Sequence, residues 1–438
     1  MFWNQFFDNI RKARAASLSA AVLLAAVAAP LAQAQTLTVL HAFSDTPDGG
    51  NPNPLIRDAQ GNLYGTTAWG GAVCGGGYTC GTVFKLDSSG NETVLYRFTG
   101  GLDGANSVAA LVQDAAGNLY GTTRGNGSIP ASSTIFKVDT SGHETVLFDF
   151  HSSGGCCADS PLALDAAGNL YGTSPYGGDF NCGTDQLGCG TVYRLTQSGN
   201  FSVLHTFTGA DGTHPDGGLV RDTKGNLYGG TYFGGDLGCV SIEGGGNQNP
   251  PGCGVVFELR GNAAGSMPYS VLHTFTGQAD GSTPLVVIQD PSGNLYGLTN
   301  YGGDLTCYPP VGCGTIFKLD TKGNFTVLFT FTSAITRTPY YASQLVRDSE
   351  GNLYGAKQFD GANNDGFLFK LDTKGNLTDV FDFPPGGSFE GSDPVSLLMD
   401  SAGNFYGSLL QGGRPLCGPP NSGEGCGTVF ELTTKAGH

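Results

Sequence analysis

Hydrophobic residues along this chain fall into short β-rich runs, and no long apolar core segment or amphipathic helix separates them. A typical set contains an apolar run such as residues 219–221, a Gly-Thr-Val-Phe run such as 81–86, and a Val- and Tyr-containing run such as 93–98. Such runs, joined by Gly-rich turns, are typical of short β-strands. We therefore predict an all-β protein.

One turn motif divides these runs into repeating units. The pattern Asp-x-x-Gly-Asn-(Leu/Phe)-Tyr-Gly occurs seven times, with its aspartates 56, 51, 57, 68, 58 and 52 residues apart, at Asp58, Asp114, Asp165, Asp222, Asp290, Asp348 and Asp400. The Asp can accept hydrogen bonds from amides of its own turn, and the Gly can adopt a left-handed conformation. Each unit then holds four short strands, which is typical of a propeller blade, and the motif joins the first two strands.

The order of the runs at the two ends of the chain predicts how the ring closes. The fourth run of the unit first occurs at residues 38–43, before the first motif, and the last unit ends at its third run, 427–432. We therefore predict a seven-bladed β-propeller with four antiparallel strands per blade, in which the N-terminal strand completes the last blade. Closure would hide the sheet edges. A linear solenoid is the structural alternative.

Residues 1–34 are expected to be a signal peptide, which leaves residues 35–438 as a single propeller domain. Basic residues precede an Ala- and Leu-rich run, and Ala32-Gln33-Ala34 forms a small-x-small cleavage pattern. A permanent membrane span fits less well because the apolar run contains serines and ends at Pro30. We expect a secreted or periplasmic protein with no membrane insertion after signal removal.

The net charge limits the expected partners. The precursor carries −16, and residues 1–34 contribute +2, so the mature chain carries about −18. This charge repels phosphate backbones and anionic lipids, so we expect no nucleic acid partner. A glycan, a peptide or a cell-surface partner remains open, and we expect a monomer without a cofactor, although Ca²⁺ is an option.

Ten of the 12 cysteines form pairs at equivalent positions between the second and third strands. In an exported chain this pairing predicts disulfide bonds, each stabilising the fold by roughly 2–3 kcal/mol, rather than a zinc site. The pairs are Cys74/Cys80, Cys182/Cys189, Cys239/Cys253, Cys307/Cys313 and Cys417/Cys426. The adjacent Cys156 and Cys157 form either a vicinal disulfide or bonds to other loops or chains.

The repeated segments 225–229, 254–259 and 270–277 resemble the GloVer tandem-repeat proteins of bacteria. The resemblance covers nearly all of the mature chain and implies an exported repeat protein. It carries no activity or catalytic residues to transfer. The Asp-x-x-Gly-Asn-Leu-Tyr motif is also similar, more distantly, to blades of NHL and gluconolactonase-type propellers. This likeness supports the fold and no particular function, because the same fold hosts unrelated functions.

Candidate ligand-binding residues lie in the two kinds of loop expected on one face of the ring. They are the Asp-Gly aspartates Asp48, Asp103, Asp211 and Asp280, the Gly-Gly-Asp residues Asp179, Asp236 and Asp304, and the nearby Tyr176, Tyr232 and Tyr301. Carboxylates can hold Ca²⁺, and carboxylates with aromatic rings suit sugars. The alternative is that Asp-Gly is ordinary turn chemistry.

The chain shows no recognisable catalytic motif. Three histidines, His41, His205 and His273, occupy a position that other blades fill with aromatics, which favours packing. Similar groups on every blade favour an exported, non-catalytic binding scaffold over a site of unlike converging groups. The alternative is an extracytoplasmic hydrolase or lyase with a metal or acidic site near the axis.

Overall fold

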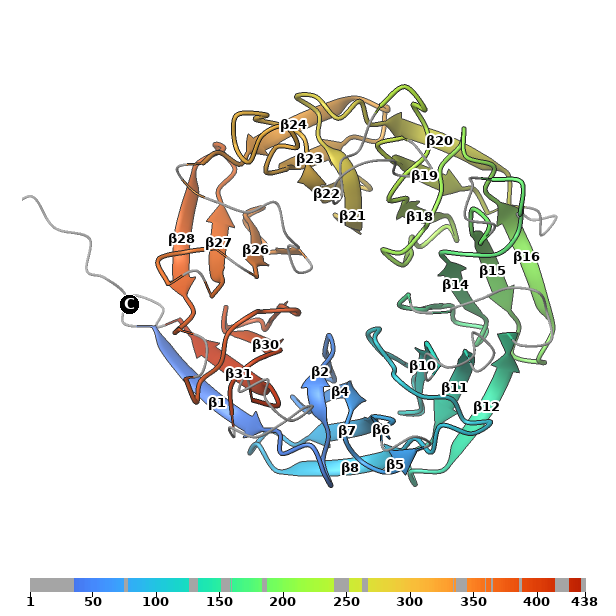
Figure 1. Cartoon of the computed structure of the whole chain (residues 1–438), viewed down its shortest axis with the longest axis vertical. Coiled ribbons are helices and arrows are strands. Elements are labelled where there is room, and N and C mark those ends of the chain that lie inside the picture. Colours follow the sequence, from blue (N-terminus) through green and yellow to red (C-terminus); the bar gives the residue numbers. More distant parts are fainter. Residues whose placement is uncertain are drawn as a thin grey trace, which may run out of the picture. The chain divides into compact units, whose positions relative to one another are not determined.

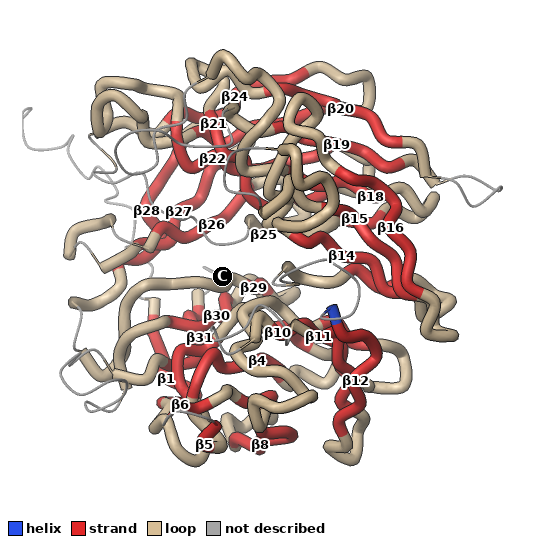
Figure 2. The backbone as a smooth tube through the Cα atoms, turned by 45° about the vertical axis from the view of Figure 1, so that its right-hand side comes forward, coloured by secondary structure: helices blue, strands red, loops and turns tan. Residues whose placement is uncertain are grey.

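Seven antiparallel sheets stand as blades around a central axis in the computed structural model of the chain (Figure 1). The structure describes residues 35–74, 78–125, 133–150, 158, 160–182, 187–239, 252–261, 267–333, 335, 345–358, 360–363, 365–385, 388–413 and 425–434. Within these ranges the named elements are strands, shown in red in Figure 2, and Phe150 is a helical residue, drawn in blue. The predicted all-β, seven-bladed propeller is therefore confirmed.

Each blade contains four main strands from the axis outward, and in blades 1 to 6 this order follows the sequence. Blades 1 to 3 are formed by β3 (Ile56–Arg57), β4 (Leu63–Trp69), β7 (Thr82–Leu86) and β8 (Glu92–Arg97); by β9 (Val112–Gln113), β10 (Leu119–Thr123), β11 (Thr134–Val138) and β12 (Glu144–Asp149); and by β13 (Ala163–Leu164), β14 (Leu170–Ser174), β15 (Thr191–Leu195) and β16 (Phe201–Thr206). Blades 4 and 5 are formed by β17 (Val220–Arg221), β18 (Leu227–Gly230), β19 (Val255–Leu259) and β20 (Tyr269–Thr274); and by β21 (Ser282–Gln289), β22 (Leu295–Tyr301), β23 (Thr315–Leu319) and β24 (Phe325–Thr330).

Blade 6 contains β25 (Val346–Arg347), β26 (Leu353–Lys357), β27 (Phe367–Leu371) and β28 (Leu377–Asp382). Blade 7 contains β29 (Leu398–Met399), β30 (Phe405–Leu409), β31 (Thr428–Thr433) and β1 (Thr36–Ala42). Blade 1 carries three additional short strands, β2 (Gly50–Pro52), which pairs with β4, and the hairpin β5 (Val73–Cys74) and β6 (Tyr78–Thr79).

The N-terminal strand closes the ring, as the sequence predicts. Strand β1 lies beside β31 as the outer strand of blade 7 (Figure 1). Just beyond β1, the Phe43 amide donates to the Gly427 carbonyl at 3.1 Å, and farther in, the Ser408 hydroxyl donates to the Asn53 carbonyl at 2.9 Å. The two ends of the ring are therefore joined both at its outer edge and near its inner strands.

The repeated Asp motif forms the turn between the first two strands of each blade. In blade 5 the Asp290 carboxylate accepts hydrogen bonds from the Ser292 and Asn294 amides, the Asn294 side chain and the Tyr296 hydroxyl, at 2.8 to 3.1 Å. Burial would raise the pKa of Asp290, but these donors outweigh burial and lower it. The motif aspartate is a structural clamp that fixes the turn.

Aromatic pairs hold neighbouring blades together. At each of the seven blade interfaces, a phenylalanine that follows the fourth strand packs edge-on against an aromatic ring on the third strand of the next blade, with centroids 5.1 to 5.6 Å apart. The pairs are Phe43–Phe84, Phe98–Phe136, Phe150–Tyr193, Phe207–Phe257, Phe275–Phe317, Phe331–Phe369 and Phe383–Phe430. Gly65 is the last residue of the motif in blade 1. A Cβ at this position would lie 2.7 Å from Phe84 Cζ, so glycine is needed to leave room for the phenylalanine ring.

Residues Leu37–Thr433 form one compact unit that contains the described blades. The proposed signal segment, residues 1–34, lies outside the described residues. In the part of the chain that the structure describes, no helix is both long and apolar enough to cross a membrane.

Candidate functional site

The predicted candidate residues lie on one side of the ring. Because the strands of a blade alternate in direction, the loops between second and third strands emerge on the same side as the loops that lead to the next blade. We call this side the loop face, and we call the opposite side, which carries the Asp-motif turns, the turn face.

Four of the predicted disulfide bonds brace the loop face. Cys74–Cys80, Cys182–Cys189, Cys239–Cys253 and Cys307–Cys313 have Cα atoms 5.5 to 5.9 Å apart. Cys426 is also disulfide-bonded, but its predicted partner Cys417 lies outside the described residues, as do Cys156 and Cys157. These bonds indicate an oxidising, extracytoplasmic location.

Each braced loop also supports the loop that leads to the next blade. Gly277 has a φ of +74°, and a Cβ there would lie 2.6 Å from Cys239 Sγ and 2.8 Å from Cys253 Sγ. Gly100 packs in the same way on Cys74 and Cys80. One disulfide therefore restrains two loops of the same blade.

The aspartates in the connections between blades are bonded to their own loops. Each accepts hydrogen bonds from a Ser or Thr at the start of its loop and from a ring on the preceding fourth strand. The ring contacts are His41–Asp48 (3.1 Å), Tyr96–Asp103 (2.9 Å), His205–Asp211 (2.9 Å) and His273–Asp280 (3.2 Å). Burial would raise the pKa of Asp211, but hydrogen bonds from His205 and Thr208 lower it.

Two of these histidines also join neighbouring blades. His205 stacks on Tyr269 with centroids 3.8 Å apart, and His273 stacks on Phe325 at 3.7 Å. Phe148 stacks on Phe201 at the equivalent place, 4.1 Å away. Packing, the role predicted from the alternation of His with aromatics, is what the structure shows.

The three Gly-Gly-Asp residues shape the turn that leads to the first cysteine of a pair. Their Oδ1 atoms accept the amide two residues on, and their carbonyls accept the cysteine amide at 3.0 to 3.3 Å. Hydrogen bonds from Thr306 lower the pKa of Asp304. The residues concerned are Asp179 with Cys182, Asp236 with Cys239, and Asp304 with Cys307.

The structure brings two of the three predicted tyrosines together around a histidine that the sequence did not single out. His214 lies between Tyr176 and Phe233, with centroids 5.1 and 5.6 Å away and the rings edge-on. Tyr232 lies 6.0 Å from Phe233, whereas Tyr301 is buried in blade 5. His214 has a φ of +54°, and its Nδ1 lies 3.0 Å from the Thr213 hydroxyl.

Exposed apolar side chains gather on the loop face. Of the ten large hydrophobic side chains exposed in the described residues, eight lie on this face: Trp69, Val73, Leu102, Phe180, Leu187, Leu237, Tyr308 and Phe389. The other two, Val203 and Val271, lie on outer strands. Such a concentration is a common mark of an interaction surface.

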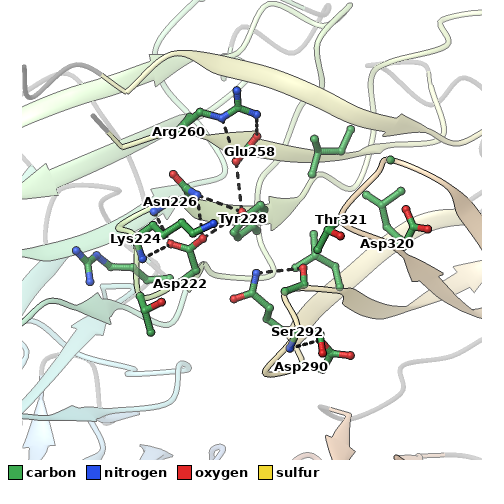
Figure 3. Close-up of a pocket in the computed structure, with 18 of the residues that line it drawn as sticks. Asp222, Lys224, Asn226, Tyr228, Glu258, Arg260, Asp290, Ser292, Asp320 and Thr321 are labelled. Carbon is green, nitrogen blue, oxygen red and sulfur yellow. Dashed lines mark hydrogen bonds and ion pairs between the residues drawn. The ribbon is translucent and has the colours of Figure 1, made fainter. Parts of the chain in front are cut away.

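The turn face carries a cleft between blades 4 and 5, with a volume of about 1010 Å³. Figure 3 shows Glu258 and Arg260 on one wall, and Asp290 and Thr321 on the other. Glu258 is buried, and it accepts from Arg260 Nη2 at 2.8 Å and from the Tyr228 hydroxyl at 3.3 Å. Burial and the nearby carboxylates raise the pKa of Tyr228 to about 12. This cleft was not predicted from the sequence.

The ring and its braced loops define the protein as a disulfide-stabilised seven-bladed β-propeller. Sequence comparison assigns it further: the chain belongs to the Gloeobacter/Verrucomicrobia repeat family, which matches residues 31–185 and 184–418. The resemblance seen in the repeated segments is therefore confirmed. None of the curated proteins matches the chain in sequence.

Solved structures with similar folds include virginiamycin B lyase from Staphylococcus aureus, with a TM-score of 0.54, 11% identity, and coverage of 91% of this chain and 99% of that one. Another is the extracellular domain of a hybrid two-component system protein from B. thetaiotaomicron (0.52, 12%, 90% and 41%). A gluconolactonase from Xanthomonas campestris is less similar (0.42, 13%, 91% and 90%). At such identities the likeness shows the fold alone.

The described residues contain no group of three or more His, Cys, Asp or Glu side chains arranged to hold a metal ion.

Proposed function

We propose that this protein is an exported, non-catalytic binding protein whose loop face engages a glycan or a cell-surface partner. The observation that carries the proposal is the position of the exposed apolar side chains. Five of them lie within two residues of a bonded cysteine: Val73, Phe180, Leu187, Leu237 and Tyr308. The disulfides therefore hold apolar groups out toward solvent.

Restrained loops favour binding because they lose little conformational entropy when a ligand orders them. Exposing an apolar side chain gives no stability to the isolated fold, so its repeated exposure beside a covalent brace favours a role outside the fold. The aspartates of the same loops support this reading, because their carboxylates position the loops themselves.

The exposed apolar side chains of the loop face suit an extended partner. Trp69, Phe180, Tyr308 and Phe389 offer aromatic faces that can stack on sugar rings, whereas the leucines and valines suit a protein surface. Because similar groups recur around the ring, several weak contacts would add up to a strong interaction with a repeating polymer.

The test compares loop-face and outer-strand variants of the mature protein. We expect the triple substitution Phe180→Ser, Leu237→Ser and Tyr308→Ser to weaken binding at least tenfold in a glycan array and on intact cell surfaces. The control substitutes Val203→Ser and Val271→Ser, which are 49% and 38% exposed on outer strands. Equal binding by all forms, or equal loss in the control, would overturn the proposal.

One observation favours the alternative, an extracytoplasmic hydrolase or lyase. His214 is held between two aromatic rings on the loop face, and a positioned imidazole can act as a general acid or base. A broad hydrolase and lyase screen should therefore include the His214→Ala variant. Robust turnover that this substitution abolishes would replace the binding proposal with the enzymatic one.

A further inference from the structure

On the turn face, one hollow of about 1340 Å³ extends over the turns of blades 1 to 3, and a second large hollow is the cleft between blades 4 and 5. Its volume is about 1010 Å³, against about 210 Å³ between blades 5 and 6 and about 350 Å³ between blades 1 and 2. Ligand pockets commonly measure about 300–1,000 Å³. The cleft between blades 4 and 5 therefore has room for a ligand of several rings.

Two departures from the commonest form of the repeat lie beside this cleft, the first of which, a glutamate on the third strand, also occurs in blade 7 as Glu431. In most blades a lysine on the third strand lies over the motif tyrosine, as Lys318 does 5.6 Å from the Tyr296 ring. Blade 4 has Glu258 instead, turned toward Arg260. The turn after this strand is also longer. It is closed by a hydrogen bond from the Arg260 amide to the Pro268 carbonyl, whereas the equivalent turn in blade 5 is closed by a bond from the Asp320 amide to the Asn324 carbonyl.

The carboxylates that line the cleft are engaged in hydrogen bonds within the protein. Asp222, Asp290 and Asp320 each accept three or more hydrogen bonds within their own turns. Glu258 is paired with Arg260.

The positive groups are different. Lys224 on the blade 4 wall and Lys322 on the blade 5 wall form no ion pair with any described residue. Both lysines are exposed and line the cleft from neighbouring blades, and the charge of Lys322 adds to the hydrogen bonds from Asn324 that lower the pKa of Asp320.

We propose that this cleft binds an acidic oligosaccharide whose carboxylate or sulfate groups are held by Lys224 and Lys322. The remaining lining is rich in hydroxyl and amide groups that match the hydroxyls of sugar rings, among them Gln289. Ser292 and Thr321 are two others, labelled in Figure 3. The chain as a whole carries a net charge of −16, so an anion is repelled from most of the surface and held here. The site lies opposite the loop face and does not depend on the proposed function of that face.

Titration calorimetry of the mature protein tests this site with three probes: a trigalacturonate, a heparin-derived tetrasaccharide and neutral maltotriose. We expect an anionic probe to bind, and its affinity to fall as salt is raised from 50 to 500 mM. Binding of the carboxylated probe alone identifies uronate as the ligand chemistry, and binding of the sulfated probe alone identifies sulfate. Binding of neither anionic probe, or equal binding of maltotriose, would overturn the proposal.

Matched variants locate the binding in the cleft. The Lys224→Gln, Lys322→Gln double variant should bind at least tenfold more weakly. The control is Lys374→Gln. Lys374 occupies the position in blade 6 that Lys322 occupies in blade 5, but it lies outside the cleft, so this substitution should change affinity less than twofold. Both lysines of the cleft are exposed, so thermal melting should be unchanged. The loop-face triple variant should bind the anionic probe as strongly as the unchanged protein. If the loop-face variant loses binding while the lysine variants keep it, the binding site does not lie in this cleft.

Discussion

Replacing Asp290 with Asn should destabilise the propeller strongly, although the shape of the side chain is kept. Asp290 is 9% exposed, and its Oδ2 atom accepts from the Asn294 side chain at 2.8 Å and from the Tyr296 hydroxyl at 3.1 Å. An amide nitrogen in that place cannot accept either bond. Charge-assisted hydrogen bonds contribute about 1.5–3 kcal/mol each, and partial rehydration lowers the sum, so we expect a loss of about 2–4 kcal/mol.

The chain supplies a matched control in the same blade. Asp320 accepts the equivalent three turn bonds, from the Lys322 amide, the Asn324 amide and the Asn324 side chain, but it has no tyrosine partner and is half-buried, whereas Asp290 is buried. Asp320→Asn should therefore cost much less. This contrast separates the contribution of the tyrosine bond and burial from that of the turn alone.

Thermal melting with intact disulfides measures both variants. At about 2.1 cal/mol/K of unfolding entropy per residue, a loss of about 2–4 kcal/mol in a ring of this length lowers Tm by about 2–5 °C. The effect should also depend on pH. The folded pKa of Asp290 lies below 3.8, so its stabilising effect is present above that value and is lost as the pH falls through the folded pKa. Equal shifts for the two variants at pH 7 would refute the reasoning.

Three further predictions test other parts of the fold. Gly277→Ala should lower Tm more than Gly323→Ala, because both have positive φ but only the first would press on a disulfide; equal shifts would contradict this. Phe43→Ala should cost about 3–5 kcal/mol in denaturant unfolding because this fully buried ring packs on Phe84 across the closure, and a loss below about 1 kcal/mol would contradict that role. Burial and the nearby Asp103 raise the pKa of Glu144 to about 7. The folded state therefore holds a proton that the unfolded state releases between pH 4.5 and 7, so Glu144→Gln should raise Tm increasingly across that window, and a shift that does not vary with pH would argue against it.

The fold could be predicted because its main determinants are local and repeated. Each blade contains a motif whose Asp, Gly and Tyr interact within a single hairpin, as Asp290 and Tyr296 do. The pairing of β1 with β31 followed from counting runs at the two ends. The aromatic contacts between blades could not be predicted in the same way, because Phe43 and Phe84 meet only once the blades are packed. The extra strand β2 in blade 1 was likewise unforeseen.

Only part of the candidate site could be predicted from the sequence. Paired cysteines predicted the braces, because both members are present or absent together. The Asp-Gly residues were open to two interpretations, and the structure adds bonds such as His205–Asp211 that hold the loops. The exposure of Phe180 beside a disulfide depends on loop conformation, which composition does not specify. Glu258 was visible as a departure from a lysine position, but the cleft it lines depends on the spacing between two blades.

The shared final blade has a consequence for how the protein matures. Strands β31 and β1 lie nearly 400 positions apart in the chain, yet each is the hydrogen-bonding neighbour of the other. Individual hairpins can form as soon as their own residues are available, but the circle is complete only after the last strand has been delivered. Until then the growing array keeps an open edge, so a polypeptide that crosses a membrane in unfolded form would gain its full rigidity only on arrival at the far side.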